Sequence, residues 1–206
     1  MTWAGLRCIR IQKKSYRKVP DIGRLTYLFV LCFIREVRDG MKSKKGKTPE
    51  LKAINIKNVW DITKLKVADH QTDFVAPNGY SIIEAYAVQA SGYVALPFGL
   101  YENDVPVGFV MIGYGSIGDD EEPQFVKDSY CIWRFMIDER YQGKGLGKAA
   151  MEKTLDYIRT FPCGKARFCW LSYEPENTAA KALYSQYGFK ETGEMDGEEV
   201  IAILML

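Results

Sequence analysis

A strand-like run that leads into a glycine-rich turn is the part of the sequence best suited to chemistry. Residues 129–137 are nearly all apolar, and a helical segment follows the turn. The turn reads Gly143, Lys144, Gly145, Leu146, Gly147 and Lys148. Glycine lets the backbone approach a ligand closely, and a helix start offers free N–H groups with a partial positive charge. The segment therefore predicts a phosphate-binding site with two lysines beside it.

Three phosphate-binding patterns compete for this turn. The P-loop pattern GxxxxGK[ST] is absent from the sequence. The dinucleotide pattern GxGxxG is incomplete, because Lys148 stands where the last glycine belongs. The third pattern, Q/R-x-x-G-x-G/A, is filled by Gln142, Gly145 and Gly147.

A second motif follows the next predicted strand. Asn177 begins the stretch NTAAKALYSQYGF, which contains Tyr184 and ends at Phe189. Asn177 and Tyr184 are two helical turns apart, so they share one helix face. With the glycine turn, a strand and this motif in that order, the sequence resembles the GCN5-related N-acetyltransferase (GNAT) family over residues 51–206. Residues 1–50 have no counterpart in that family.

The resemblance implies an α/β fold. A mixed, mostly antiparallel sheet would carry helices on both faces and splay at two parallel strands, residues 131–137 and 166–173. It also implies that acetyl-CoA lies in this gap as a co-substrate, without a metal. The cofactor-binding residues that it implies are Phe135, Met136, Ile137, Gln142, Gly143, Lys144, Gly145, Leu146, Gly147, Lys148 and Asn177.

The family's mechanism is direct attack of an amine on the thioester, so most of the catalysis is positioning. Tyr184 matches the tyrosine that protonates the leaving thiolate in this family. Its alternative role is that of a core tyrosine whose hydroxyl caps a neighbouring strand. Asn177 combines two roles, as a helix N-cap and as a hydrogen-bond partner of the cofactor.

The sequence does not assign the base. An aliphatic amine has a pKa near 10 and must lose a proton before it attacks. Some relatives place a glutamate on the strand before the glycine turn, where this chain has Trp133 and Arg134. Glu84, Glu174 and Glu176 are the candidates, and each serves equally well as a cap or a solvated carboxylate.

The charge of the GNAT-like part favours a polycationic substrate. Residues 51–206 hold 15 Lys or Arg and 22 Asp or Glu, a balance of −7. Glu84, Glu174 and the acidic residues 119–122 could bind a long cationic amine, although the 119–122 group is equally typical of a solvated loop. The stretches WRFMIDERYQGKGLG and LSYEPEN are similar to bacterial spermine/spermidine (diamine) N-acetyltransferases. The prediction is acetyl transfer to a polyamine; the alternative is another amine, such as an aminoglycoside, a small amine, a protein N-terminus or a lysine.

The N-terminal part has the opposite charge. Residues 1–50 hold 13 Lys or Arg and 4 Asp or Glu, which gives +9 and raises the alternative of an anion- or nucleic-acid-binding module. No recognition motif supports that alternative, and the apolar run 25–34 is too short to span a bilayer as a helix. We expect a basic extension over residues 1–50, with translation of the native chain starting at Met41, and no nucleic-acid or membrane partner.

Cysteine and histidine usage points away from metal and disulfide chemistry. The five cysteines form no CxxC pair, and His70 is the only histidine. A reducing, cytoplasmic compartment is expected from this pattern. The family resemblance is also compatible with a homodimer.

Hydrophobic periodicity predicts the elements that position these motifs. Strands are predicted at residues 51–56, 94–101, 105–114, 129–137, 166–173, 189–195 and 198–204. Helices are predicted at residues 56–67, 81–90, 145–160 and 177–187. Ser81 and Glu84 have capping-box spacing, and Asp196-Gly197 predicts a type I′ hairpin.

Overall fold

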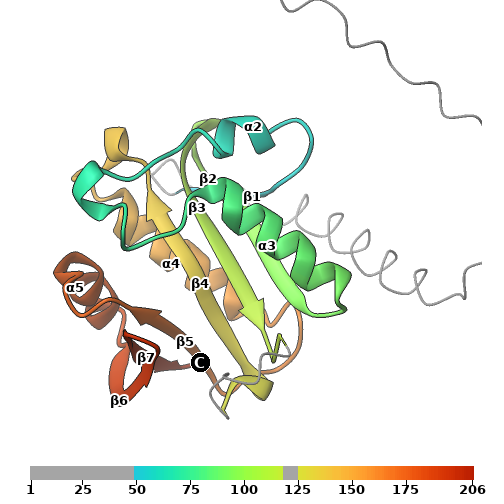
Figure 1. The fold of residues 1–206 in the computed structure, drawn as a ribbon, viewed down its shortest axis with the longest axis vertical. Coiled ribbons are helices and arrows are strands. Elements are labelled where there is room, and N and C mark those ends of the chain that lie inside the picture. The colour runs from blue at the N-terminus through green and yellow to red at the C-terminus, as the bar shows by residue number, and fades with distance from the viewer. Residues whose placement is uncertain (1–48, 118–124) are drawn as a thin grey trace, which may run out of the picture. The chain divides into compact units, whose positions relative to one another are not determined.

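The computed structural model describes residues 49–117 and 125–206 (Figure 1). Its strands are β1 (Glu50–Ala53), β2 (Val94–Glu102), β3 (Val105–Tyr114), β4 (Ser129–Ile137), β5 (Phe168–Tyr173), β6 (Lys190–Asp196) and β7 (Glu199–Met205). Its α-helices are α2 (Val59–Ile62), α3 (Asn78–Ala90), α4 (Leu146–Ile158) and α5 (Thr178–Gln186). Short 3-10 turns lie at Asp69–Gln71, Val126–Asp128 and Glu139–Tyr141. The predicted extension over residues 1–50, apart from its last two residues, and the acidic residues 119–122 lie outside the described residues.

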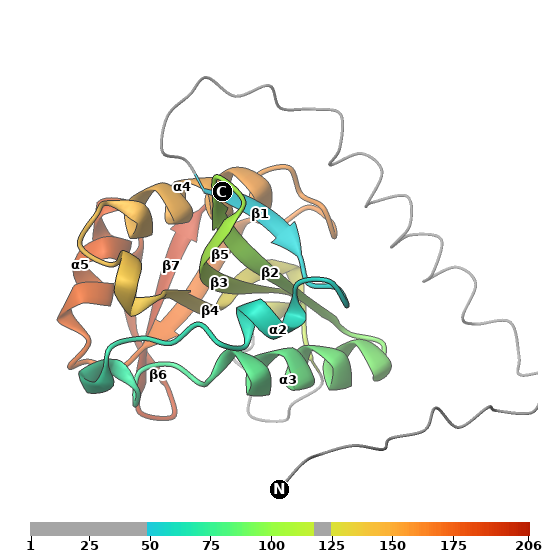
Figure 2. The ribbon, with the colours of Figure 1, turned by 90° about the horizontal axis from the view of Figure 1, so that it is seen from above.

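The strands form one sheet in the order β1-β2-β3-β4-β5-β7-β6. Every neighbouring pair is antiparallel except β4 and β5, which run parallel. One core packs the sheet against α4 and α5, and a second packs it against α2 and α3 on the other face (Figure 2). The predicted mixed sheet with helices on both faces is therefore confirmed.

The two parallel strands separate soon after they meet. Pairing between β4 and β5 covers only residues 129–131 and 168–170, so residues 132–137 of β4 have no strand beside them there. The Asp138 N–H donates to Val107 of β3, which sets the alternation along the strand. The N–H and carbonyl of Met136 therefore point toward β3, whereas those of Phe135 and Ile137 point into the gap. The predicted splay is present.

Two predictions about the first helices are wrong. The helix predicted over residues 56–67 is only α2, four residues long. The chain leaves the helix after Thr63 because the Lys66 N–H donates to the Asp138 carboxylate and the Lys66 carbonyl accepts from Glu139. Long-range bonds therefore replace the helical ones that the apolar spacing predicted.

Helix α3 begins at Asn78, with Pro77 as its N-cap, and not at the predicted capping box of Ser81 and Glu84. Asn78 is buried, and its side-chain amide donates to the Ile62 carbonyl at 2.9 Å, which fixes the helix start. Ser81 lies inside the helix, and its hydroxyl donates to the Pro77 carbonyl.

The hairpin between β6 and β7 is confirmed, but its turn is shifted by one residue. Asp196 pairs with Glu199, so Gly197 and Glu198 form the turn. Gly197 has a φ of +59°, whereas Glu198 is not in the left-handed region. A type I′ turn requires positive φ at both central residues, so that predicted type is wrong.

Within the described residues, no helix is both long and apolar enough to cross a membrane.

Candidate active site

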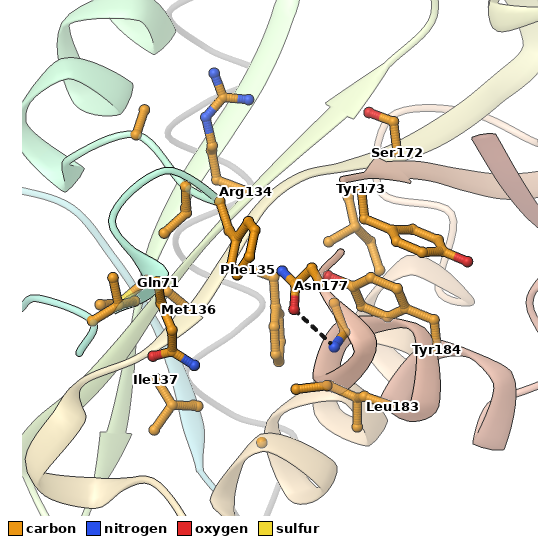
Figure 3. A pocket seen from close by; sticks show the side chains of 18 of the residues that line it. Gln71, Arg134, Phe135, Met136, Ile137, Ser172, Tyr173, Asn177, Leu183 and Tyr184 are labelled. Atoms are coloured by element: carbon orange, nitrogen blue, oxygen red, sulfur yellow. Dashed lines mark hydrogen bonds between the residues drawn. The ribbon is translucent and has the colours of Figure 1, made fainter. Parts of the chain in front are cut away.

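A cavity of about 370 Å³ occupies the gap between β4 and β5 (Figure 3). Figure 3 shows Arg134 and Ser172 at one end and Leu183 at the other, with Phe135 and Asn177 between them. Seven of the predicted site residues line this pocket: Phe135, Met136, Ile137, Gln142, Gly147, Asn177 and Tyr184. The structure thus brings both sequence motifs to one cavity.

The glycine turn presents open backbone beside the pocket. Gly143 and Gly145 have φ of +73° and +81°, a region that L side chains rarely adopt, and nothing lies within 4 Å of a Cβ added at either. Gly145 is the N-cap of α4 and offers no side-chain cap. The first amides of α4, at Leu146, Gly147 and Lys148, have no acceptor within the helix. This geometry fits a diphosphate group.

Gln142 ties the turn to the end of β4. Its side-chain amide donates to the Ile137 carbonyl at 2.8 Å and to the Gln71 side chain at 2.9 Å. The Ile137 carbonyl therefore already accepts a hydrogen bond. The Ile137 N–H and the N–H and carbonyl of Phe135 remain for a ligand that pairs along the strand. Gln142 orients the turn through its amide nitrogen.

The lysines of the turn differ in their contacts. The Lys144 ammonium donates to the Arg140 carbonyl at 2.7 Å and lies 5.4 Å from the centre of the Tyr141 ring. Lys148 is exposed on the first turn of α4. Both stand next to the free amides, where they add positive charge for an anion.

Asp138 anchors the chain just before the turn. Its carboxylate accepts from the Lys66 N–H at 3.1 Å and from the Arg140 guanidinium at 2.7 Å. Burial alone would raise the pKa of Asp138, but the hydrogen bonds from Arg140 and Lys66 outweigh it and lower the pKa below its usual value. The anchor is therefore charged at neutral pH.

Asp138→Asn is expected to lower the free energy of unfolding by about 2 kcal/mol at pH 7, because it replaces charge-assisted bonds at a buried site. Since the native pKa is lowered, this stabilisation is present at neutral pH and is lost as the pH falls through the native pKa. Urea unfolding at pH 7 and at acidic pH measures it. Asp156→Asn, on the exposed side of α4, is the control. Equal losses for the two variants would contradict the anchoring role.

Asn177 caps α5, as predicted. Its side-chain oxygen accepts from the Ala180 N–H at 3.1 Å (Figure 3). Its side-chain nitrogen has no hydrogen-bond partner among the residues that the structure describes and is available to a ligand in the pocket.

Tyr184 lies next to Asn177 and is only 8% exposed. In the described part of the chain, no group hydrogen-bonds to its hydroxyl. Burial raises its pKa, and the negative charge of Glu199 and the nearby Tyr173 raise it further. The phenol therefore stays protonated at physiological pH, as a proton donor must.

The opposite end of the pocket carries charged groups. Arg134 bonds to Glu84 of α3 at 3.2 Å and to the Trp133 carbonyl at 2.9 Å, while its buried Nε has no partner in the described structure. Glu199 of β7 accepts a hydrogen bond from the Ser172 hydroxyl. This end can hold a polar or ionised acceptor.

Some predicted residues lie outside the lining. Glu84 and Glu174 do not line the pocket; Glu84 is paired with Arg134, and Glu174 follows the end of β5. The pocket is also lined by residues that the sequence did not indicate: Ser172, Glu199, Val67, Gln71 and residues 73–76. The alternation of β5 could have indicated Ser172, since Leu171 and Tyr173 are buried on the other face. No local signal marks Glu199.

In the ranges 49–117 and 125–206, no group of three or more His, Cys, Asp or Glu side chains is placed to hold a metal ion.

Comparison with known proteins shows the family and the fold of the chain. Residues 60–189 match the family described as Acetyltransferase (GNAT) family. The spermine/spermidine N(1)-acetyltransferase of Bacillus subtilis is 34% identical over 159 residues, which cover 72% of this chain and 97% of that protein. The [ribosomal protein bS18]-alanine N-acetyltransferase of Escherichia coli is 37% identical over 68 residues, 33% of this chain and 44% of that protein. The crystal structure of aminoglycoside acetyltransferase AAC(6')-Ib in complex with coenzyme A has a similar fold, with a TM-score of 0.64 and 16% identity, over 77% of this chain and 95% of that one.

Proposed function

The chain belongs to the acetyltransferase (GNAT) family, and from that premise we propose that it transfers the acetyl group of acetyl-CoA to a primary amine of spermidine, spermine or a shorter diamine. The observation that carries the proposal is the parting of β4 from β5 directly beside the free amides of α4. One gap in the sheet thus offers strand main chain and a helix N-terminus to a single ligand.

Each part of the site has a role in this proposal. Bound acetyl-CoA supplies an activated acetyl group as a thioester. The amides of residues 143–148, with Lys144 and Lys148, bind its diphosphate. The main chain of Phe135 and Ile137 pairs with the pantetheine arm, Met136 contributes its side chain to the lining, and Asn177 donates its free amide. The amine attacks directly, and Tyr184 protonates the departing sulfur.

The polyamine preference rests on charge and on the relative from Bacillus subtilis. Burial raises the pKa of Glu174, and the nearby Glu199, Glu176 and Glu198 raise it further, which shows that negative charge gathers beside the pocket. Such a field attracts a polycation. We assign Glu174 to a distal ammonium group of the substrate, whereas Glu84 is paired with Arg134 and does not serve as a free anion.

The proposal extends to the setting of the enzyme. Cys131, Cys163 and Cys169 are free thiols, which fits the reducing cytoplasm that we propose as its compartment. We propose a small-molecule acceptor, without a nucleic-acid or membrane partner, and a homodimer as the working assembly.

A thiol-release assay with acetyl-CoA tests the function over an amine panel of spermine, spermidine, putrescine, an aminoglycoside and a lysine peptide. We expect the highest kcat/KM with spermidine or spermine. Preference for the aminoglycoside or the peptide would overturn the polyamine assignment, and no release with any amine would overturn the acetyltransferase activity itself.

A further inference from the structure

A group at the end of the pocket that carries Arg134, Ser172 and Glu199, the acceptor end, must remove a proton from the incoming amine. An aliphatic amine has a pKa close to that of lysine, about 10.4, so nearly all of it is protonated at pH 7. Two carboxylates line the pocket, those of Asp73 and Glu199. These two carboxylates are therefore the candidates for the base that removes this proton.

The strand alternation places Glu199 and Ser172 on the same face of the sheet. Val200 and Ala202 of β7 pack in the core shared with α4 and α5, so Glu199 points to the opposite face. Tyr173 of β5 also packs in that core, so the preceding Ser172 points the same way as Glu199. The Ser172 hydroxyl donates to the Glu199 carboxylate and holds one of its oxygens.

Glu199 and Tyr184 line the same cavity from different faces of the sheet. Tyr184 belongs to the core with α4 and α5 and packs on Tyr173, with 5.5 Å between the ring centres, whereas Glu199 is on the face of α3. The charge of Glu199 nevertheless acts on Tyr184, because it is one cause of the raised pKa of that phenol. A carboxylate that can take a proton and a phenol that can give one thus line the same cavity.

Resting on the proposed function, we propose that Glu199, oriented by Ser172, is the base that takes the proton from the substrate ammonium group. The ammonium proton passes to the Glu199 carboxylate, and the neutral nitrogen forms a bond to the thioester carbonyl carbon. The carbon–sulfur bond breaks, and the sulfur leaves with a proton from Tyr184. The second nitrogen proton returns to Tyr184, and Glu199 releases its proton to water, so products are acetyl-amine, free thiol and one proton.

The other carboxylates near the site are placed less well for this step. Glu84 is already paired with Arg134 at 3.2 Å, and Glu174 does not line the pocket. Asp73 lines it from an exposed loop position. The titratable and charged groups around Glu199 are Tyr173 and Glu174 at the end of β5, Asp196 and Glu198 at the hairpin, Tyr184 of α5, and Cys131 and Arg134 of β4.

The test compares kcat/KM for spermidine from about pH 6 to about pH 10 in wild type and Glu199→Gln. Glutamine keeps the size of the side chain and its bond from Ser172 but accepts no proton. We expect an approximately 100-fold lower kcat/KM at pH 7. The variant should gain about tenfold per pH unit as free amine accumulates, while the wild type stays level, so the deficit closes at about pH 9.

Ser172→Ala tests the positioning role. It should lower kcat/KM by less than Glu199→Gln does and shift the acidic limb of the wild-type profile. Glu194→Gln makes the same chemical change at an exposed position of β6 outside the pocket and should keep the wild-type profile.

Two results would overturn the assignment. Glu199→Gln could keep the wild-type rate and profile, or Asp73→Asn could show the expected loss in its place. Either result leaves the proposed function intact if the wild type acetylates spermidine. If the wild type prefers another amine, the substrate assignment fails and the same pH comparison on that amine decides the role of Glu199.

Discussion

Gly147→Asp should strongly weaken coenzyme A binding while leaving the fold at least as stable. Gly147 is the second residue of α4 and lines the pocket, and an added Cβ would meet only Ile137, at 3.9 Å. A carboxylate in the first helical turn stabilises a helix by about 0.3–1 kcal/mol. The same carboxylate would occupy the place proposed for the diphosphate, and like charges at such distances cost several kcal/mol. We therefore expect affinity to fall about 1,000-fold.

Calorimetry with coenzyme A and a thermal melt measure the two effects on one sample. Gly147→Asn is the matched control, because it has the same shape without the charge. Steric blocking alone would lower the coenzyme A affinity of both variants equally. Charge repulsion should lower the affinity of the aspartate variant much more. Unchanged binding in both variants would show that the diphosphate does not bind at the start of α4.

The glycine turn and the NTAAKALYSQYGF motif could be predicted from the sequence because their structure is local. The left-handed φ of Gly145 and the capping bond of Asn177 depend on residues within one turn of each. The strand residues 129–137 are predicted with their bounds, because a nearly continuous apolar run in the middle of a sheet leaves few alternatives.

The helix predicted over residues 56–67 failed for the opposite reason. Its apolar spacing was correct, but Asp138, more than 70 residues away, takes the Lys66 N–H and pulls the chain out of the helix. The start of α3 likewise depends on a bond between Asn78 and the Ile62 carbonyl. Long-range hydrogen bonds of this kind leave no periodic pattern in a single sequence.

The acceptor end of the site was missed because it is assembled by the sheet order. Ser172 and Glu199 come together because β7 pairs with β5, and Arg134 meets Glu84 across 50 residues. Glu84 was expected to be a free anion for the substrate, whereas the structure gives it a cationic partner within the protein, Arg134. The half of the site proposed to bind the coenzyme is built from local sequence motifs. The half proposed to receive the amine is built by the strand order of the sheet.

Tyr184→Phe should lower kcat by about 100- to 10,000-fold, the usual range for a lost general acid, with little change in coenzyme A affinity. Only the hydroxyl is removed, and that hydroxyl has no hydrogen-bond partner in the described structure, so the packing against Tyr173 and Phe189 is kept. Stopped-assay kcat and calorimetric binding measure the two quantities. Tyr86→Phe, on the exposed side of α3, is the control. A kcat equal to that of the wild type would show that Tyr184 is not the general acid.

The pH profile separates this variant from Glu199→Gln. Burial, Glu199 and Tyr173 raise the pKa of Tyr184 above its usual value of about 10, so the phenol is protonated throughout the range about pH 6–10. Loss of its hydroxyl should lower the profile without changing its shape. The phenol is also a weaker acid than a thiol, whose pKa is about 8.5, so a proton moves from Tyr184 to sulfur only if another replaces it. The attacking nitrogen, which becomes strongly acidic as it bonds to carbon, supplies that proton to Tyr184.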